Sequence, residues 1–220
     1  MYNNKPQIKI GDKWSYEEWG LLLGQGWFLE SPKPKTILID IPASDGVLDL
    51  TEALAGEPRY ENRQLKFGLV FTQPESEWDA IRAKVDNYCN GQRMKIILPQ
   101  DIDRHLMGRL NPTYLERGKG TATFDIEASC DPWRYKNNLT VVNITVQNNY
   151  FGVLYNERRR VIPEITTSAS VHITINGVSH SMSPGTYKFT DFILNEGENP
   201  FSITSNVNAE VTITYQEAGF

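Results

Sequence analysis

Alternation of apolar and polar residues predicts most of the elements in the first half of the chain. Apolar residues recur at every second position in several short runs, which is typical of strands with one buried face. Residues 15–23 fit a short helix or a strand equally well. The runs that predict strands are 36–41, 65–71, 94–98, 105–110 and 121–128.

One segment of the first half has helical periodicity instead. Its apolar residues, Trp78, Ile81, Val85 and Tyr88, recur at intervals of three and four. Thr72 and Glu75 have the spacing of a capping box, and Asn90-Gly91 is suited to end a helix. We therefore expect one helix there, with its apolar stripe packed into a core.

The second half changes composition toward Thr, Val, Ile and Asn. Residues 142–146, 171–175 and 211–215 alternate, and Asn176-Gly177 is typical of a two-residue hairpin turn. Short alternating strands with regular turns predict an antiparallel β-sandwich without helices. We expect a boundary near residues 134–138, which gives two domains, 1–136 and 137–220, and a mainly β fold with one α-helix.

Residues 41–56 form the most unusual segment. They open with Pro42 and Asp45-Gly46, which are turn formers, and they contain no nucleophile, base or metal cluster. Long, partly apolar loops without chemistry usually contact another surface. The apolar residues are therefore candidate intersubunit contacts, with packing inside the chain as the alternative: Val47, Leu48, Leu50 and Leu54.

Charge and cysteine content restrict the function further. The net charge is −5, which argues against a sheath that binds nucleic acid. Cys89 and Cys130 lack a zinc or CxxC spacing, so we expect reduced, partly buried structural thiols, with a disulfide or another metal role as the alternative. The first residues lack a signal-peptide apolar core and no run is long enough to span a membrane, so we expect a cytoplasmic protein without membrane insertion.

No catalytic constellation is found in the sequence. His105, His172 and His180 lie outside any known triad or metal motif, and neither Asp101 and Asp103 nor the acids of 45–52 have the spacing of a calcium loop. We therefore expect no enzyme, no metal and no cofactor. A cell-wall hydrolase is the enzymatic alternative, and it would need an acid pair or a metal site in a cleft.

Two features of the second domain suggest contacts. The basic run Arg158, Arg159 and Arg160 is either a solvated turn or a salt-bridging contact with a partner subunit. The aromatic residues 150, 151, 155, 187, 189 and 192 could include a platform for sugars, although alternation assigns most of them to the core. A carbohydrate-binding protein acting through this domain is therefore the alternative to a structural role.

Several separated blocks resemble the distal tail protein family of siphophages, the hub or baseplate component of long, non-contractile phage tails. The resemblance covers about the first 135 residues. The blocks are SYEEWGLLL (15–23), PKTILIDIPASDGVLDLTEALAG (34–56), YENRQLKFGLVF (60–71), WDAIRAKVDNYCNGQRMKIIL (78–98), GRL (108–110) and GTATFDIEASCDPWRY (120–135).

The resemblance implies a tail-tube-like β-sandwich plus helix in the first domain. It implies a galectin-like or carbohydrate-module-like β-sandwich in the second. Six copies would form a ring at the virion tail tip, between the tail tube protein and the tail-associated lysin or tail fibre protein, and some members also hold receptor-binding proteins. Assembly would take place in the cytoplasm of a bacterial host. The sequence does not distinguish an infectious phage from a prophage or a tailocin as its source.

A ring of this kind makes specific demands on the chain. Each copy needs one patch that meets a different patch on the next copy. The segments 41–63 and 99–120 are the candidates for reaching a neighbour. A bore that lets DNA pass without specific nucleic-acid binding should be acidic or neutral, and Asp101 and Asp103 are the candidate lining residues.

Overall fold

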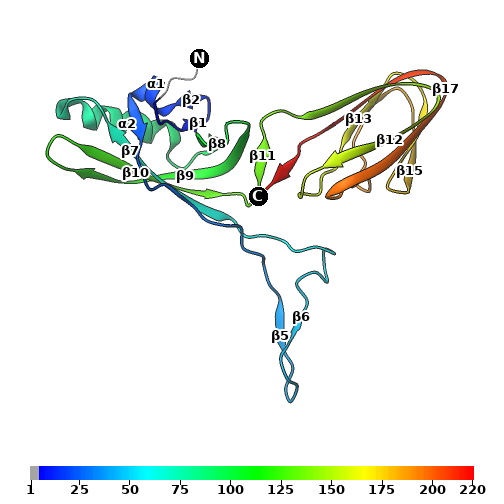
Figure 1. The fold of residues 1–220 in the computed structure, drawn as a ribbon, viewed down its shortest axis with the longest axis horizontal. Coiled ribbons are helices and arrows are strands. Elements are labelled where there is room, and N and C mark those ends of the chain that lie inside the picture. Colours follow the sequence, from blue (N-terminus) through cyan, green and yellow to red (C-terminus); the bar gives the residue numbers. More distant parts are fainter. Residues whose placement is uncertain (1–4) are drawn as a thin grey trace. The chain divides into compact units, whose positions relative to one another are not determined.

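The computed structural model describes residues 5–220 and is mainly β (Figure 1). The chain forms two compact units: the first runs to Arg134 and also includes Phe220, and the second is Tyr135–Gly219. The prediction of a mainly β chain with one main helix is confirmed. Within the described residues, no helix has the length and apolar character that a membrane span requires.

The first unit is built on one antiparallel sheet with the strand order β2-β1-β8-β9-β10-β7-β3, and β4 pairs with β7 beside β3. Residues 15–23 contain both elements that their pattern allowed, because a five-residue helix leads into a strand. The sheet strands are β1 (Lys9–Ile10), β2 (Lys13–Trp14), β3 (Leu21–Leu23), β4 (Phe28–Leu29), β7 (Arg63–Phe71), β8 (Arg93–Ile97), β9 (Arg104–Arg117) and β10 (Ala122–Cys130). The helices are α1 (Ser15–Trp19), the 3-10 turn η1 (Glu75–Glu77) and α2 (Trp78–Cys89).

Strand β7 shows how the alternation builds the core of this unit. Its four alternate apolar residues are buried, and its intervening residues face outward, as the sequence predicted: the buried residues are Leu65, Phe67, Leu69 and Phe71. Gly68 of this strand lies close to β10. A Cβ atom there would lie 2.7 Å from Cγ2 of Thr123 on β10, so only glycine fits without movement.

Helix α2 packs its apolar stripe into the same core, but the predicted capping box is wrong. The helix begins at Trp78, after the 3-10 turn, and no side chain caps it. The Thr72 hydroxyl instead donates a hydrogen bond to the carbonyl of Gly20 at 2.8 Å, which ties it to another segment. The expected end is confirmed, because Gly91 has a φ of 71° after the last turn.

The second unit is a curled antiparallel sheet with the strand order β15-β14-β17-β13-β16, and β12 pairs along the whole of β17. Residues 201–204 of β17 pair with β14, and residues 211–214 pair with β13. One strand thus serves both halves of the sheet. The strands of this sheet are β12 (Thr140–Asn156), β13 (Glu164–Thr167), β14 (Val171–Ile175), β15 (Val178–Met182), β16 (Gly185–Tyr187) and β17 (Gly197–Tyr215). Outside this sheet, β11 (Arg134–Lys136) and β18 (Ala218–Gly219) pair with each other.

A bulge allows the long β12–β17 ladder to bend. The register shifts between Val146 and Asn148, and Asn148 has a φ of 73°. The hairpin turn predicted at Asn176-Gly177 is confirmed, because both residues have positive φ and join β14 to β15. Both halves of the sheet contribute to one core, which includes Ile144, Val146, Ile165, Ile173, Phe192, Ile203, Val211 and Ile213.

Candidate assembly site

Residues 33–61 form a two-stranded extension of the first unit, which we call the arm. Its strands are β5 (Leu38–Asp40) and β6 (Val47–Asp49), and they make a separate two-stranded sheet (Figure 1). Every residue from 33 to 49 is exposed. The predicted strand over 36–41 therefore exists only as β5, and it adds nothing to the core, because the sheet of the first unit does not continue into the arm.

The base of the arm is held by backbone pairing and aromatic contacts. The amide of Lys35 donates to the carbonyl of Arg59 at 2.7 Å, and Pro34 bridges to Tyr60. The Tyr60 ring packs edge-on against Trp133 and Phe220, which stack on each other with centroids 4.8 Å apart. The two strands thus leave the unit from a fixed point.

The register of the arm separates it into two different faces. Ile39 lies opposite Leu48, while Leu38 lies opposite Asp49 and Val47 opposite Asp40. Side chains alternate between faces along each strand. One face is therefore wholly apolar, and we call it the apolar face of the arm: Ile37, Ile39, Ile41, Leu48 and Leu50. The other face mixes Leu38 and Val47 with the two aspartates.

The four sequence-predicted contact residues all lie in the arm, but they do not share one face. Val47, Leu48 and Leu54 are 57%, 45% and 90% exposed, and Leu50 is half-buried. None of the four belongs to the core of the first unit. Sequence reasoning missed Ile37, Leu38, Ile39 and Ile41, which are 42–54% exposed, because it assigned them to an ordinary core strand.

The tip of the arm is a tight turn with one unusual residue. The amide of Ser44 donates to the carbonyl of Ile41 at 3.1 Å, with Pro42 and Ala43 between them. Ala43 has a φ of 66°, which a type II turn requires at that position and which usually selects glycine. Pro42 favours the turn, so the hairpin closes in spite of the unfavourable positive φ of Ala43.

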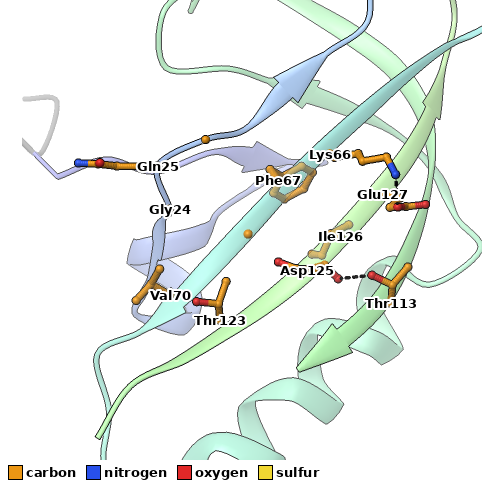
Figure 2. A pocket seen from close by; sticks show the side chains of 12 residues that line it. Gly24, Gln25, Lys66, Phe67, Val70, Thr113, Thr123, Asp125, Ile126 and Glu127 are labelled. Carbon is orange, nitrogen blue, oxygen red and sulfur yellow. Dashed lines mark hydrogen bonds and ion pairs between the residues drawn. The ribbon is translucent and has the colours of Figure 1, made fainter. Parts of the chain in front are cut away.

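A hollow of about 370 Å³ lies on the outward face of β7 and β10 in the same unit (Figure 2). Gly68 and Gly24 leave its floor without side chains, and the Gly24 amide donates to the Gly68 carbonyl at 2.8 Å. Lys66 pairs with Glu127 at 2.6 Å on its rim. The hollow is a concave feature on the unit that also carries the arm.

Asp125 gives this hollow its electrostatic character. Burial raises the pKa of its carboxyl group, and the nearby carboxylates of Glu116 and Glu127 raise it further. Lys66 is held by Glu127, so the rim is acidic overall. The residues that line the hollow include no histidine or cysteine.

The two candidate bore residues lie between β8 and β9 and differ from each other. Asp101 is half-buried, and its carboxylate lies 3.4 Å from Nη1 of Arg134 and 3.9 Å from Nε of Arg104. Its charge is therefore largely compensated within the unit. Asp103 is exposed.

The basic run of the second unit lies in the turn between β12 and β13. Arg159 has a structural role: its guanidinium carbon lies 5.4 Å from the ring centre of Tyr135, and its amide donates to the carbonyl of Ala218. Arg158 and Arg160 are exposed. Of the three arginines, these two present their side chains at the surface.

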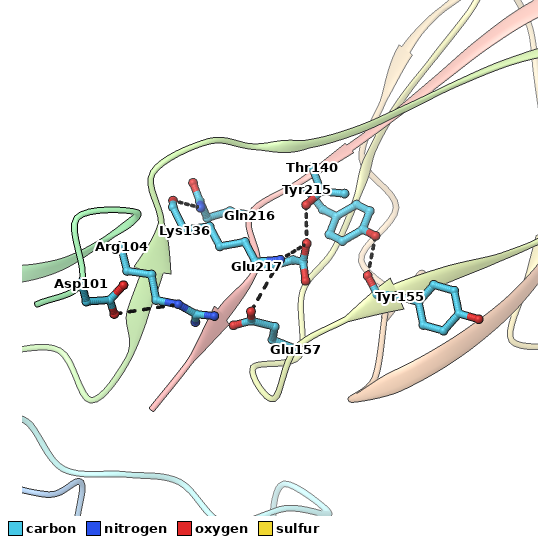
Figure 3. A network of polar contacts seen from close by, with 9 residues as sticks. All are labelled: Asp101, Arg104, Lys136, Thr140, Tyr155, Glu157, Tyr215, Gln216 and Glu217. Atoms are coloured by element: carbon cyan, nitrogen blue, oxygen red, sulfur yellow. Dashed lines mark hydrogen bonds and ion pairs between the residues drawn. The ribbon is translucent and has the colours of Figure 1, made fainter.

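A network of polar contacts joins the ends of the second unit next to this turn (Figure 3). Nζ of Lys136 lies 2.8 Å from the carboxylate of Glu217 and 3.5 Å from that of Glu157. Thr140 donates a hydrogen bond to Glu217, which is 7% exposed. The network fixes the start and the end of the unit beside each other.

The remaining candidates for chemistry are two cysteines and three histidines. Cys89 and Cys130 are free, as expected, and they are fully buried rather than partly buried. Burial raises the pKa of each thiol to about 12. His105 is buried, His172 is exposed, and His180 lies 2.8 Å from Asp191. Across residues 5–220, no cluster of three or more acids, histidines or cysteines could hold a metal ion.

The aromatic residues of the second unit do not follow the expectation that most are core. Phe192 is buried, but Phe151 and Tyr155 are 78% and 61% exposed, and Tyr150 is 38% exposed. Phe151 and Tyr155 lie on the outward face of β12, which sequence reasoning did not distinguish from the inward face. Tyr150 lies on the opposite face, where its ring packs against the buried Phe201.

Comparison with known proteins gives a structural likeness. No protein-family model matches the chain, and no curated protein sequence matches it. Among solved structures, the chain is similar to the Dit protein (gp 19.1) of phage SPP1, which is described as a paradigm of the hub adsorption apparatus in phages that infect Gram-positive bacteria. The TM-score is 0.70 at 12% identity, over 97% of this chain and 99% of that one. The likeness therefore extends over both units, and it shows a shared fold.

Proposed function

We propose that this protein is a structural hub of a phage tail tip, where six copies close into a ring. One observation carries the proposal: the arm exposes a continuous apolar face on a chain whose whole fold is similar to a phage hub protein. Monomeric soluble proteins rarely expose a contiguous apolar surface of this kind unless it binds something. The chain is then an assembly component and not an enzyme.

The shape of the first unit supports a head-to-tail contact. A ring needs two different patches, one to project and one to receive. The arm projects, and an isolated two-stranded hairpin is only marginally stable in water, so a partner surface would stabilise it. The hollow at Gly68 is the candidate receiving patch, because it is concave and lies on the same unit.

The proposed partners follow from a position at the tail tip. The ring would contact the tail tube protein on one side and the tail-associated lysin or tail fibre protein on the other. The second unit, through Arg158 and Arg160, would contact a partner subunit or a receptor-binding protein. The protein would assemble in the host bacterial cytoplasm and remain in the virion.

The bore of the ring should not retain DNA. Asp103 is the better of the two candidate lining residues, since it is exposed, whereas Asp101 is compensated by Arg104 and Arg134. A weakly acidic or neutral lining does not attract the phosphates of DNA, so it allows the genome to pass.

Negative-stain imaging and mass photometry of the purified chain test the proposal directly. We expect ring-shaped particles with six-fold symmetry and six times the monomer mass, formed by the chain alone at high concentration or with its tube partner. Particles that stay monomeric or two-fold under both conditions would contradict it. A deletion of residues 37–50 is the matched control, and it should remain monomeric and folded.

A further inference from the structure

The outward face of one half of the second unit is divided between apolar and hydroxyl side chains. Strands β12, β17, β14 and β15 lie side by side there. The β12 edge presents Phe151, Val153 and Tyr155, which we call the aromatic row. Strands β17, β14 and β15 present the hydroxyl face, whose members are His172, Thr174, Ser179, Ser181, Ser202 and Thr204.

The aromatic row is open to solvent. Phe151 is 78% exposed, Tyr155 61% and Val153 43%. The three residues occupy alternate positions of one strand, so their side chains share one side of the sheet over about 13 Å. Edge strands are usually protected by charged residues or proline, but Thr140–Asn156 contains neither. An unprotected aromatic row of this length indicates a contact surface.

The hydroxyl face is ordered by hydrogen bonds across the strands. The hydroxyl oxygens of Thr174 and Ser179 lie 2.8 Å apart, and Nδ1 of His172 lies 3.1 Å from the Ser181 hydroxyl. Each hydroxyl group has one donor and two acceptor positions, so one such bond leaves capacity for a ligand. The pairs hold the side chains in place, which lowers the entropy that binding would cost.

The hydroxyl face continues into a hollow of about 340 Å³. His172, Ser181 and Thr204 belong to both, and the hollow adds Ser183 and Asn206. This volume lies in the range of small-molecule sites. Together with the aromatic row, the face spans four strands, or about 14 Å across the sheet.

The charges of this surface limit the kind of ligand. The hydroxyl face and the aromatic row contain no lysine or arginine, and Glu198, which lies opposite Tyr155 on β17, accepts a hydrogen bond from the Tyr155 hydroxyl at 3.2 Å. Phosphate-rich polymers would need cations here. Sugar rings present apolar C–H surfaces to aromatic rings and hydroxyl groups to Ser, Thr and His.

We propose that this surface binds a neutral polysaccharide, with sugar rings stacked on Phe151 and Tyr155 and hydroxyl groups bonded to the hydroxyl face. A protein partner fits less well, because the centre of the surface is polar, whereas protein interfaces have an apolar centre and a polar rim. The proposal goes beyond the hub role and does not depend on ring assembly.

Amide chemical-shift mapping of the full chain tests the site. The probes are maltoheptaose, cellohexaose, chitohexaose and a neutral rhamnose–glucose polysaccharide, with poly(glycerol phosphate) as the anionic comparison. At least one neutral probe should shift amides of β12, β14 and β17, and the anionic probe should not. Failure of all four neutral probes at millimolar concentration, stronger binding of the anionic probe, or shifts confined to other strands would each overturn the proposal.

Variants assign the binding to the named side chains. Phe151→Ser should weaken the bound probe by about tenfold or more, since aromatic anchors dominate such contacts. Tyr114→Ser is the matched control, because Tyr114 is a 64% exposed strand aromatic of the first unit, and it should leave binding unchanged. Thr204→Val keeps the shape of the side chain and removes a hydroxyl, so it should weaken binding even where Phe151→Ser perturbs folding. Unchanged affinity in both Phe151→Ser and Thr204→Val would contradict the proposed site.

Discussion

Replacing two residues on the apolar face of the arm tests whether that face forms the ring contact. Ile39 and Leu48 lie opposite each other and are 44% and 45% exposed. Full burial of such a side chain contributes roughly 1.5–3 kcal/mol, so covering the exposed part contributes about 1 kcal/mol each. An asparagine in the same contact adds a desolvation cost of about 1 kcal/mol or more. The variant with Ile39→Asn and Leu48→Asn should therefore lose about 4 kcal/mol per contact.

That loss corresponds to an association about a thousandfold weaker at each interface. Mass photometry across a concentration series should then show monomers where the unchanged chain forms rings. The free chain should keep its stability within about 0.5 kcal/mol, because both side chains are exposed in it. Rings that form over the same concentrations as before would refute the role of the apolar face.

The opposite face of the arm supplies a matched control. Leu38 and Val47 are more exposed than the test pair, at 54% and 57%, so exposure alone would predict the larger effect for Leu38→Asn with Val47→Asn. We expect a smaller loss, since Asp40 and Asp49 share that face and require hydration. An equal or larger loss in this control would show that the arm is buried on both faces.

Mixing the variant with the unchanged chain tests the direction of the contact. In a head-to-tail ring, a copy with a defective arm can still receive the arm of a neighbour. It should therefore terminate open chains, and small amounts should reduce the number of closed rings disproportionately. A reduction only in proportion to the amount added would argue against a head-to-tail contact.

Three further predictions concern the fold. Gly68→Ala should lower the free energy of unfolding by about 1–3 kcal/mol in urea titrations, since its Cβ would lie 2.7 Å from Cγ2 of Thr123, and adding Thr123→Ser should recover part of the loss. Cys89 and Cys130 should react with a thiol reagent only after unfolding. Burial raises the pKa of each thiol to about 12, so the unfolded chain loses these protons at lower pH than the folded chain does. The free energy of unfolding should therefore fall as the pH rises from about 9 toward 12. Arg63→Met should raise the melting temperature, because it removes a buried charge that is incompletely paired. Arg63 is 3% exposed, and its Nε and Nη2 have no hydrogen-bond partner among the described residues. Burial also lowers the pKa of its guanidinium group to about 10.

The sequence determined the elements whose signal is local. Alternation along β7 and the 3.6-residue stripe of α2 identified the buried residues, since the backbone geometry fixes which side chains share a face. Asn176-Gly177 identified a hairpin because both residues tolerate positive φ. The helix start was misplaced, because Thr72 bonds to Gly20, a residue distant in the sequence.

Only the tertiary structure decided which apolar strands are covered and which are open. The pattern of 36–41 is that of a core strand, yet β5 pairs only with β6, and its isoleucines remain exposed. Likewise, Phe151 and Tyr155 alternate like core residues, but they lie on the outward side of the edge strand β12. Periodicity shows that two faces differ, and only the packing of distant segments determines which of them meets solvent.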